Sequence, residues 1–233
     1  MFGKIFGRIQ VAYTDATASV RHAARAAAAE KVNHPSDTVM GEALNQWNRT
    51  VREPTRRKPN SAAVIDGYIR ETGLGWSSAN TKKHDAAYVK NGQFHWCGAF
   101  AAHCWAKAGL KASIRKKFMP SCYRLIKGHP FSGKRWQRQV TYNKISQTWA
   151  DVLQPGDIVI VGEKGGPVWG RHITLCLEVH KDHIVTIEGN ARGEGPDGSW
   201  YEGVVRQKRP FEFSGKTYGV MHAIRPQRED LDK

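Results

Sequence analysis

The sequence predicts an α+β domain in which N-terminal helices pack on an antiparallel β-sheet. Apolar residues recur at helical spacing in several segments before residue 110, whereas short apolar or alternating segments dominate after Pro155. Helices followed by a run of strands is the element order typical of α+β proteins. The chain has 233 residues, 40% of them hydrophobic, which is enough for one well-buried domain and an appendage.

Four helices are expected in the first half of the chain. Apolar side chains recur at helical spacing over residues 1–32, and shorter helical patterns cover 38–51 and 62–71. A fourth helix should begin at Cys97 and end near Gly109, since glycine commonly follows a helix. Small residues in the first turns of this fourth helix would let a strand approach it closely.

Strands are expected after the turn at Pro155. One of them alternates between polar and apolar residues from His172 to Val179, so His172 should lie opposite the apolar face. Lys181 and Asp182 make a tight turn between this strand and the next. The expected strands cover residues 158–161, 172–179, 183–188, 204–206 and 220–224.

Composition divides the chain into three parts. A helical, basic N-terminal extension with its linker covers 1–60, the main domain covers 61–226, and a charged tail covers 227–233. Two prolines and a cluster of charges between residues 52 and 60 indicate the linker. Within the main domain, residues 111–150 contain ten lysines and arginines and no acidic residue.

The net charge and the two ends of the chain bound where the protein could act. A formal net charge of +15 predicts attraction to polyanions such as nucleic acid, anionic lipid or anionic cell-wall polymer. No apolar run approaches the about 18 residues of a membrane-spanning helix. The N-terminus lacks the apolar region of a secretory signal, so the protein is expected to be made in the cytoplasm and to act outside it after release or delivery.

The amphipathic pattern of residues 1–32 suits a helix docked on protein or, alternatively, a helix lying on an anionic membrane. The four cysteines form no CxxC pair. Their scattered spacing fits a reduced compartment better than a disulfide framework.

Cys97 is the strongest candidate for a reactive group. Trp96 and Gly98 bracket it at the expected start of a helix, where unpaired backbone N–H groups and the helix dipole favour the thiolate over the thiol. A thiolate nucleophile needs a base and a group that orients that base. Cys104 and Cys176 fit better as inert core cysteines.

His172 is the best candidate for the base because it begins a strand on the polar face of that strand. The hairpin that follows should return the next strand beside it and bring Glu188 and Asn190 near the imidazole. These two residues are two positions apart, so both are expected to point to the same side. A carboxylate or amide there can accept the second imidazole N–H and fix the tautomer.

The remaining histidines are weaker candidates. His95 and His103 flank Cys97 in the sequence, but such proximity along the chain does not give good geometry, so structural or surface roles are expected. A second set could be read as a metal cluster and consists of His172, Cys176, His180 and His183. The spacing of this set matches no common zinc pattern, so no metal ligand is expected.

Taken together, these features resemble the CHAP type (cysteine, histidine-dependent amidohydrolase/peptidase) of the papain-like NlpC/P60 superfamily. The resemblance covers about residues 61–210 and follows the family's order of cysteine, histidine and Glu-x-Asn. The segments that carry it are Trp96-Cys97 with Ala108-Gly109-Leu110, Gln154-Pro155-Gly156-Asp157-Ile158-Val159, Arg171-His172-Ile173-Thr174-Leu175 and Ile187-Glu188-Gly189-Asn190. The family's usual His-Val-Gly is replaced here by His-Ile-Thr.

The resemblance implies a papain-like fold and hydrolysis of an amide bond in the peptide of peptidoglycan, by an N-acetylmuramoyl-L-alanine amidase or an endopeptidase. It implies that Cys97 is the nucleophile, His172 the base, Glu188 the orienting residue and Asn190 an auxiliary polar group. No cofactor is expected. No Asp-rich loop like the calcium loop of some relatives precedes the cysteine, so no calcium is expected either.

Peptidoglycan is the expected partner. The basic segments would additionally suit an anionic wall polymer, lipopolysaccharide or a membrane surface. A chain without a secretory signal fits a bacteriophage lysis enzyme, a virion-associated enzyme or a delivered antibacterial effector. Two alternatives stay open: a papain-like protease or transferase acting on protein, and a non-enzymatic basic protein that binds nucleic acid or a virion. For the enzyme itself, nucleic acid is not the expected partner.

Overall fold

The structure, a computed structural model, describes residues 35–52, 60–72, 95–119, 121–128, 130–132, 135–137, 149–167, 170–212 and 218–232. The expected helix over 1–32 and most of the linker at 52–60 lie outside these ranges. Part of the basic segment 111–150 lies outside them as well.

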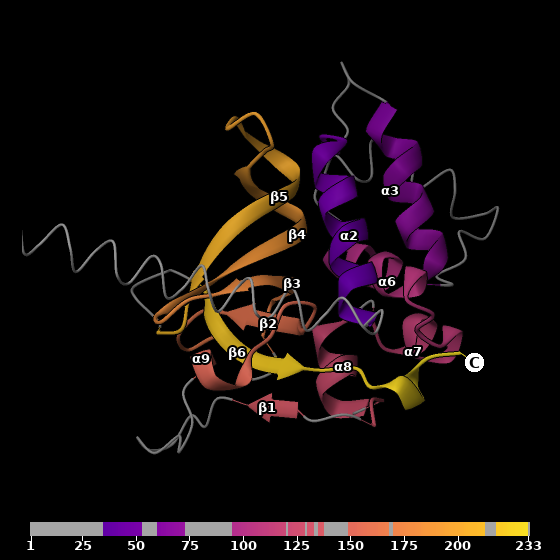
Figure 1. Cartoon of the computed structure of the whole chain (residues 1–233), viewed down its shortest axis with the longest axis vertical. Helices are drawn as coiled ribbons and strands as arrows, with labels where there is room; N and C mark the ends of the chain where they lie inside the picture. The colour runs from indigo at the N-terminus through magenta and orange to yellow at the C-terminus, as the bar shows by residue number, and fades with distance from the viewer. Residues whose placement is uncertain are drawn as a thin grey trace, which may run out of the picture. The chain divides into compact units, whose positions relative to one another are not determined.

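Six strands form one antiparallel sheet with the spatial order β1-β6-β2-β3-β4-β5 (Figure 1). Their bounds are β1 (Arg135–Gln137), β2 (Ile158–Gly162), β3 (His172–Val179), β4 (His183–Glu194), β5 (Trp200–Pro210) and β6 (Gly219–Ile224). The combination of helices with an antiparallel sheet confirms the predicted α+β class. The strand expected over 172–179 is β3, with the same bounds.

β4 and β5 are longer than the sequence pattern predicted. They form a hairpin in which Ala191 pairs with Gly203 and Gly193 pairs with Tyr201, beyond the expected end of the first strand at residue 188. Apart from Ala191, the residues of β4 beyond Glu188 are polar residues and glycines, so the local pattern does not predict a strand there. Pairing between the two strands supplies the backbone hydrogen bonds that the pattern could not reveal.

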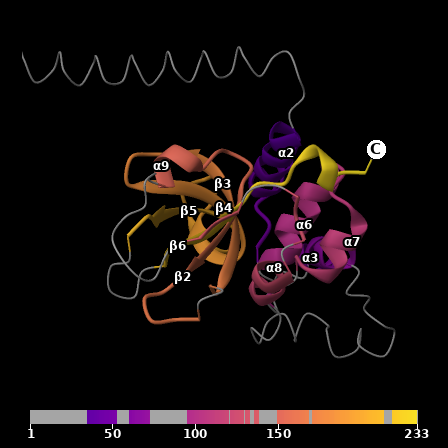
Figure 2. The same ribbon diagram turned by 90° about the horizontal axis from the view of Figure 1, so that it is seen from below.

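Helices gather on one side of the sheet, as Figures 1 and 2 show for α2, α3, α6, α7 and α8. The helices are α2 (Pro35–Asn48), α3 (Asn60–Glu71), α6 (Cys97–Lys107), α7 (Ala112–Lys117), α8 (Cys122–Gly128) and α9 (Trp149–Val152), with the 3-10 turn η1 (Arg228–Asp230) near the C-terminus. The helices α2, α3 and α6 correspond to those expected over 38–51, 62–71 and 97–108, whereas α7 and α8 in the basic segment were not expected. None of the helices in the described ranges combines the length and apolar character that a membrane span requires.

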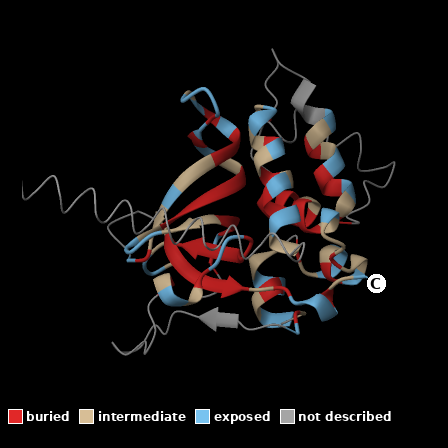
Figure 3. Ribbon diagram, viewed as in Figure 1, coloured by how far each residue is buried: buried red, intermediate tan, exposed pale blue. Residues whose placement is uncertain are grey.

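Both faces of the sheet are covered, and its central strands are buried (Figure 3). On one face, Ile173 and Leu175 of β3 and Ile187 of β4 share a core with the apolar residues of α2, α3 and α6. On the other face, Trp149 and Leu153 pack with Val159 and other apolar residues of the sheet. The sheet is therefore a layer between two apolar clusters, and the polar side chains of His172, Thr174, Thr186, Glu188 and His222 are buried within it.

The compact unit that contains the sheet runs from Pro35 to Lys233, so it begins earlier than the domain boundary expected at residue 61. Helix α2 packs on α6, and the Trp47 indole donates to the Glu194 carbonyl oxygen at 3.0 Å. The segment expected as a charged tail is also packed. Asp230 is buried and accepts from the Ser132 backbone N–H at 2.9 Å. Tertiary contacts, which composition does not reveal, place α2 and the C-terminal segment in this compact unit.

Candidate active site

Cys97 is the first residue of α6, follows Trp96, and is only 5% exposed. Close packing at Gly98 fixes this helix start. A Cβ atom at Gly98 would overlap the Met119 carbonyl oxygen and lie 3.0 Å from Cδ1 of Ile173. The absence of a side chain at this position lets the start of α6 lie against both β3 and the turn that follows α7.

A second glycine brings β4 against the same helix. A Cβ atom at Gly189 would lie 2.5 Å from Cβ of Phe100 and 2.6 Å from Cζ3 of Trp96. The strand and the helix can therefore approach this closely only because residue 189 has no side chain. Gly189 directly follows Glu188, so this contact sets the position of that carboxylate relative to α6.

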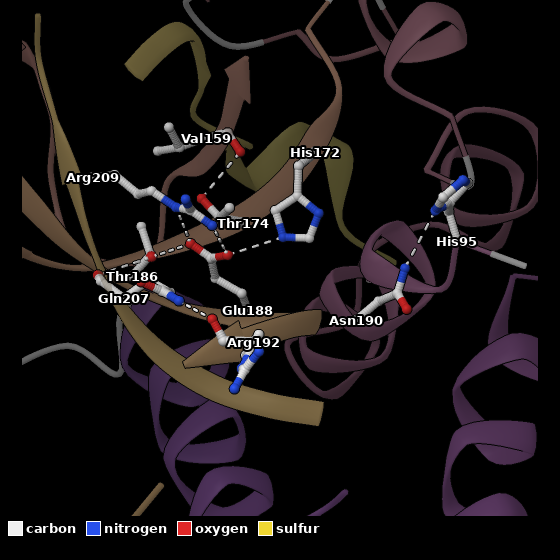
Figure 4. A network of polar contacts seen from close by, with 10 residues as sticks. All are labelled: His95, Val159, His172, Thr174, Thr186, Glu188, Asn190, Arg192, Gln207 and Arg209. Carbon is white, nitrogen blue, oxygen red and sulfur yellow. Dashed lines mark hydrogen bonds and ion pairs between the residues drawn. The ribbon is translucent and has the colours of Figure 1, made fainter. Parts of the chain in front are cut away.

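His172 and Glu188 are hydrogen-bonded partners on adjacent strands. Nε2 of His172 lies 3.0 Å from Oε2 of Glu188, and both side chains are buried (Figure 4). The His172 side chain also interacts with the Cys97 thiol by charge and by hydrogen bonding. Since Nε2 is occupied by Glu188, Nδ1 is the nitrogen left for the thiol. The structure thus brings Cys97, His172 and Glu188 into one connected row.

The electrostatics of this row favour charge separation between sulfur and imidazole. Burial opposes ionisation of Cys97, but the His172 charge, the hydrogen bond to His172 and the backbone N–H groups of Ile173 and Gly98 together lower the pKa of the thiol. Burial likewise disfavours the charged imidazole, yet the negative charge on Cys97 and the hydrogen bonds to Cys97 and Glu188 raise the pKa of His172 to about 10. A thiolate beside an imidazolium is the favoured state.

The other three cysteines lack this environment. All four are free thiols. Burial raises the pKa of Cys104 and of Cys176 well above the usual range. Burial and the charge on Cys97 raise the pKa of Cys122, which begins α8. Cys97 is therefore the cysteine whose environment favours the reactive thiolate.

The sequence reasoning missed Arg209. Its Nε lies 2.7 Å from Oε1 of Glu188 and its Nη2 lies 2.5 Å from Oε2, a bidentate ion pair with a carboxylate that is 0% exposed (Figure 4). The Thr186 hydroxyl donates to Oε1 as well. Although burial opposes it, the charge and hydrogen bonds of Arg209, together with the bond and charge of His172, hold the pKa of Glu188 well below its usual range.

The position of Arg209 near Glu188 could have been inferred from the strand register of the hairpin. On β5, Arg209 lies opposite Ile184, which precedes Glu188 by four positions on β4 and therefore shares its face of the sheet. The strand expected at 204–206 ended before residue 209, so the pairing of Arg209 with Ile184 was not predicted. Extending both strands of the hairpin would have brought a basic residue to the carboxylate.

Asn190 lies elsewhere than expected. Figure 4 shows its amide directed toward His95, with Nδ2 3.5 Å from Nδ1 of that residue, while Glu188 reaches His172 and Arg209. The expectation that Glu188 and Asn190 point to the same side is wrong, because Asn190 has a φ of 59° and the pairing register shifts between Glu188 and Ala191. His95 is exposed beside this amide.

The other histidines occupy separate places. His103 pairs with Glu42 of α2 at 2.9 Å. The rings of His180 and His183 stack with their centroids 4.5 Å apart at the hairpin between β3 and β4. Within the ranges that the structure describes, no group of three or more histidine, cysteine, aspartate or glutamate side chains is placed to hold a metal ion.

No family model, no curated protein and no solved structure matches this chain. The fold and the site define the class of this protein as an α+β fold with a buried Cys97-His172-Glu188 row, in which the cysteine begins a helix.

Proposed function

We propose that the protein is a papain-like cysteine hydrolase that cleaves an amide bond in the peptide of peptidoglycan. Cys97 acts as the nucleophile, His172 as the base, and Glu188 orients the imidazole. Asn190, whose amide faces His95, is proposed only as an auxiliary polar group. The single observation that carries the proposal is the Cys97-His172-Glu188 row with Cys97 at the start of α6.

The chemistry follows from this row. The Cys97 thiolate attacks the carbonyl carbon of the amide, and a tetrahedral intermediate forms whose oxyanion is stabilised by backbone N–H groups at the start of α6. The intermediate collapses as the C–N bond breaks, and His172 transfers its proton to the leaving amine. The now neutral His172 deprotonates water, which attacks the thioester; the C–S bond then breaks, and the Cys97 thiolate beside the His172 imidazolium is regenerated.

The substrate class rests on charge as well as on the family resemblance. Exposed basic residues lie on α7 and α8, the two helices that follow α6 in the chain; they are Lys116, Lys117, Arg124 and Lys127. Met119, between the two helices, contacts Gly98 beside the nucleophile. The carboxylate groups of wall peptides, and the phosphates of wall polymers or lipopolysaccharide, are attracted to such a surface. The site of action would be the bacterial wall, reached after release or delivery.

Digestion of purified sacculi tests this function. The wild-type protein is expected to release soluble fragments whose masses identify the amide bond that is cut. Cys97→Ala removes the nucleophile and should lower release by at least about 1,000-fold. Cys104→Ala is the matched control, since it removes a thiol of the same helix whose pKa is raised, and it should leave release at the wild-type level.

Three outcomes would overturn the proposal. Fragment release by Cys97→Ala equal to that of the wild type would remove Cys97 from the chemistry. Cleavage of an unfolded protein such as casein, without any release from sacculi, would identify a papain-like protease. Salt-sensitive binding to DNA without hydrolysis of either substrate would favour the non-enzymatic alternative.

A further inference from the structure

We propose that Arg209 is a positioning residue that clamps Glu188 and balances its charge, so that the Cys97 and His172 pair can exist as thiolate and imidazolium. This inference deepens the proposed function and rests on it for the role of Cys97. Arg209 touches neither the thiol nor the imidazole in any contact described above. Its influence passes through Glu188.

The clamp is geometric. Each Glu188 oxygen accepts one bond from Arg209, and each accepts one further bond: Oε1 from Thr186 and Oε2 from His172. A carboxylate has about four lone-pair sites, so this set fills them all. The carboxylate cannot rotate without breaking several bonds, and the plane in which it meets Nε2 of His172 is therefore held.

The charge count gives Arg209 its second effect. With Arg209 present, the buried row contains two negative groups, the thiolate and Glu188, and two positive groups, the imidazolium and Arg209. The net charge is zero, which a poorly solvated interior tolerates. Without Arg209, the same row carries one uncompensated negative charge. The least costly correction is uptake of a proton, and the thiolate is the group that then takes it up.

Few other ionisable groups face this row among the residues that the structure describes. Cys122 of α8 faces Cys97, and Tyr218 lies under the Arg209 guanidinium, 5.7 Å from ring centroid to Cζ. A thiol and a phenol carry no positive charge in either protonation state, so neither replaces the positive charge that is lost. On the same strand, Arg206 pairs instead with Glu178 at the surface, at 3.0 Å. Arg206 therefore provides a control that lies outside the row.

The test measures the rate at which iodoacetamide alkylates Cys97 as a function of pH, with the site of alkylation located by mass spectrometry. The midpoint of this profile reports ionisation of Cys97 and needs no cell-wall substrate. For Arg209→Gln the midpoint should rise by about one pH unit or more, because one nearby positive charge is lost. Arg209→Lys keeps the charge and should keep the midpoint near that of the wild type. Arg206→Gln should not move it.

A double variant sharpens the test. Glu188→Gln combined with Arg209→Gln removes one charge of each sign, so the row is neutral again and the midpoint should return toward the wild-type value. A purely structural role for Arg209 would weaken folding in both variants and would not restore the midpoint. An Arg209→Gln midpoint equal to that of the wild type would overturn the inference. Should Arg209→Gln fail to fold, an Arg209→Lys midpoint shifted as far as one pH unit would overturn it instead.

The proposed function fails in a different way. If the wild-type Cys97 shows the midpoint of an ordinary thiol, the Cys97-His172 pair is not the reactive centre, whatever Arg209 does. If the wild-type midpoint is low but sacculi stay intact, the row is reactive toward another substrate, and the role of Arg209 is still measured.

Discussion

Burial disfavours the charged forms of both Cys97 and His172, but the opposite charge on each residue favours ionisation of the other. This reciprocity has a consequence for stability. The pKa of His172 is raised in the folded state, so its contribution is full below about pH 6.5 and is lost as the pH rises toward about 10. The pKa of Cys97 is lowered, so its contribution is full above about pH 9.0 and is lost as the pH falls.

Between pH 6.5 and 9.0 the two trends cancel, because the folded pair and the unfolded pair bind the same number of protons. We expect the difference in unfolding free energy between wild type and Cys97→Ala to be largest and flat in this window and to decrease on both sides. Urea unfolding at a series of pH values measures it. A difference that changes steadily across the window would contradict the ion pair.

The pairing of Glu188 with His172 follows from short-range features of the sequence, whereas the contact of Arg209 with Glu188 depends on long-range strand register. A histidine at a strand start and a carboxylate on the returning strand are local features of a short hairpin. Arg209 lies 21 residues beyond Glu188, and only the full register of β4 and β5 brings them together. The placement of Asn190 was predicted wrongly for another reason. The prediction assumed strict alternation along the strand, and the register shift after Glu188 breaks that alternation.

At the scale of elements, the site depends on how closely β4 approaches α6. Gly189→Ala would force a Cβ atom into Phe100 and Trp96, so we expect a loss of about 1–3 kcal/mol in unfolding free energy. Displacement of β4 away from α6 would also move Glu188 away from His172. Urea unfolding measures the first effect, and the rate of Cys97 alkylation measures the second.

Gly67 in α3 is the matched control for this substitution. It lies within a helix, and among the described residues nothing beyond its own helical turns lies within 4 Å of the Cβ position. Gly67→Ala should therefore raise stability by about 0.5–1 kcal/mol, since alanine favours the helix. Equal effects of the two substitutions would show that close packing at Gly189 is not what positions β4.

Helices α7 and α8 were not predicted from the sequence. Six and seven residues long, they lack a sustained apolar period, and charges dominate their exposed faces. Ile114 and Leu125 are their buried anchors in the shared core. Packing of these residues in the shared core, more than helical propensity, stabilises such short helices.

At the scale of the whole molecule, the proposed function predicts that the net charge of +15 governs binding to sacculi. Because salt screens exposed charges, binding of the Cys97→Ala variant to sacculi should weaken markedly between about 0.05 and 0.5 M salt. A pull-down with sacculi at increasing salt measures this. Alkylation of wild-type Cys97 should change little over the same range, since its partners are buried. Binding insensitive to salt would mean that the basic surface has no part in attachment.

The sequence by itself determined the α+β class, the position of Cys97 at a helix start and its order with His172 and Glu188 along the chain. Those features follow from local periodicity and from one short hairpin. Only the tertiary structure decided that Arg209 closes around Glu188, that Asn190 points to His95, and that the compact unit includes α2 and the C-terminal turn. The physical reason is that strand register, bulges and helix docking depend on contacts between distant residues, which no local pattern records.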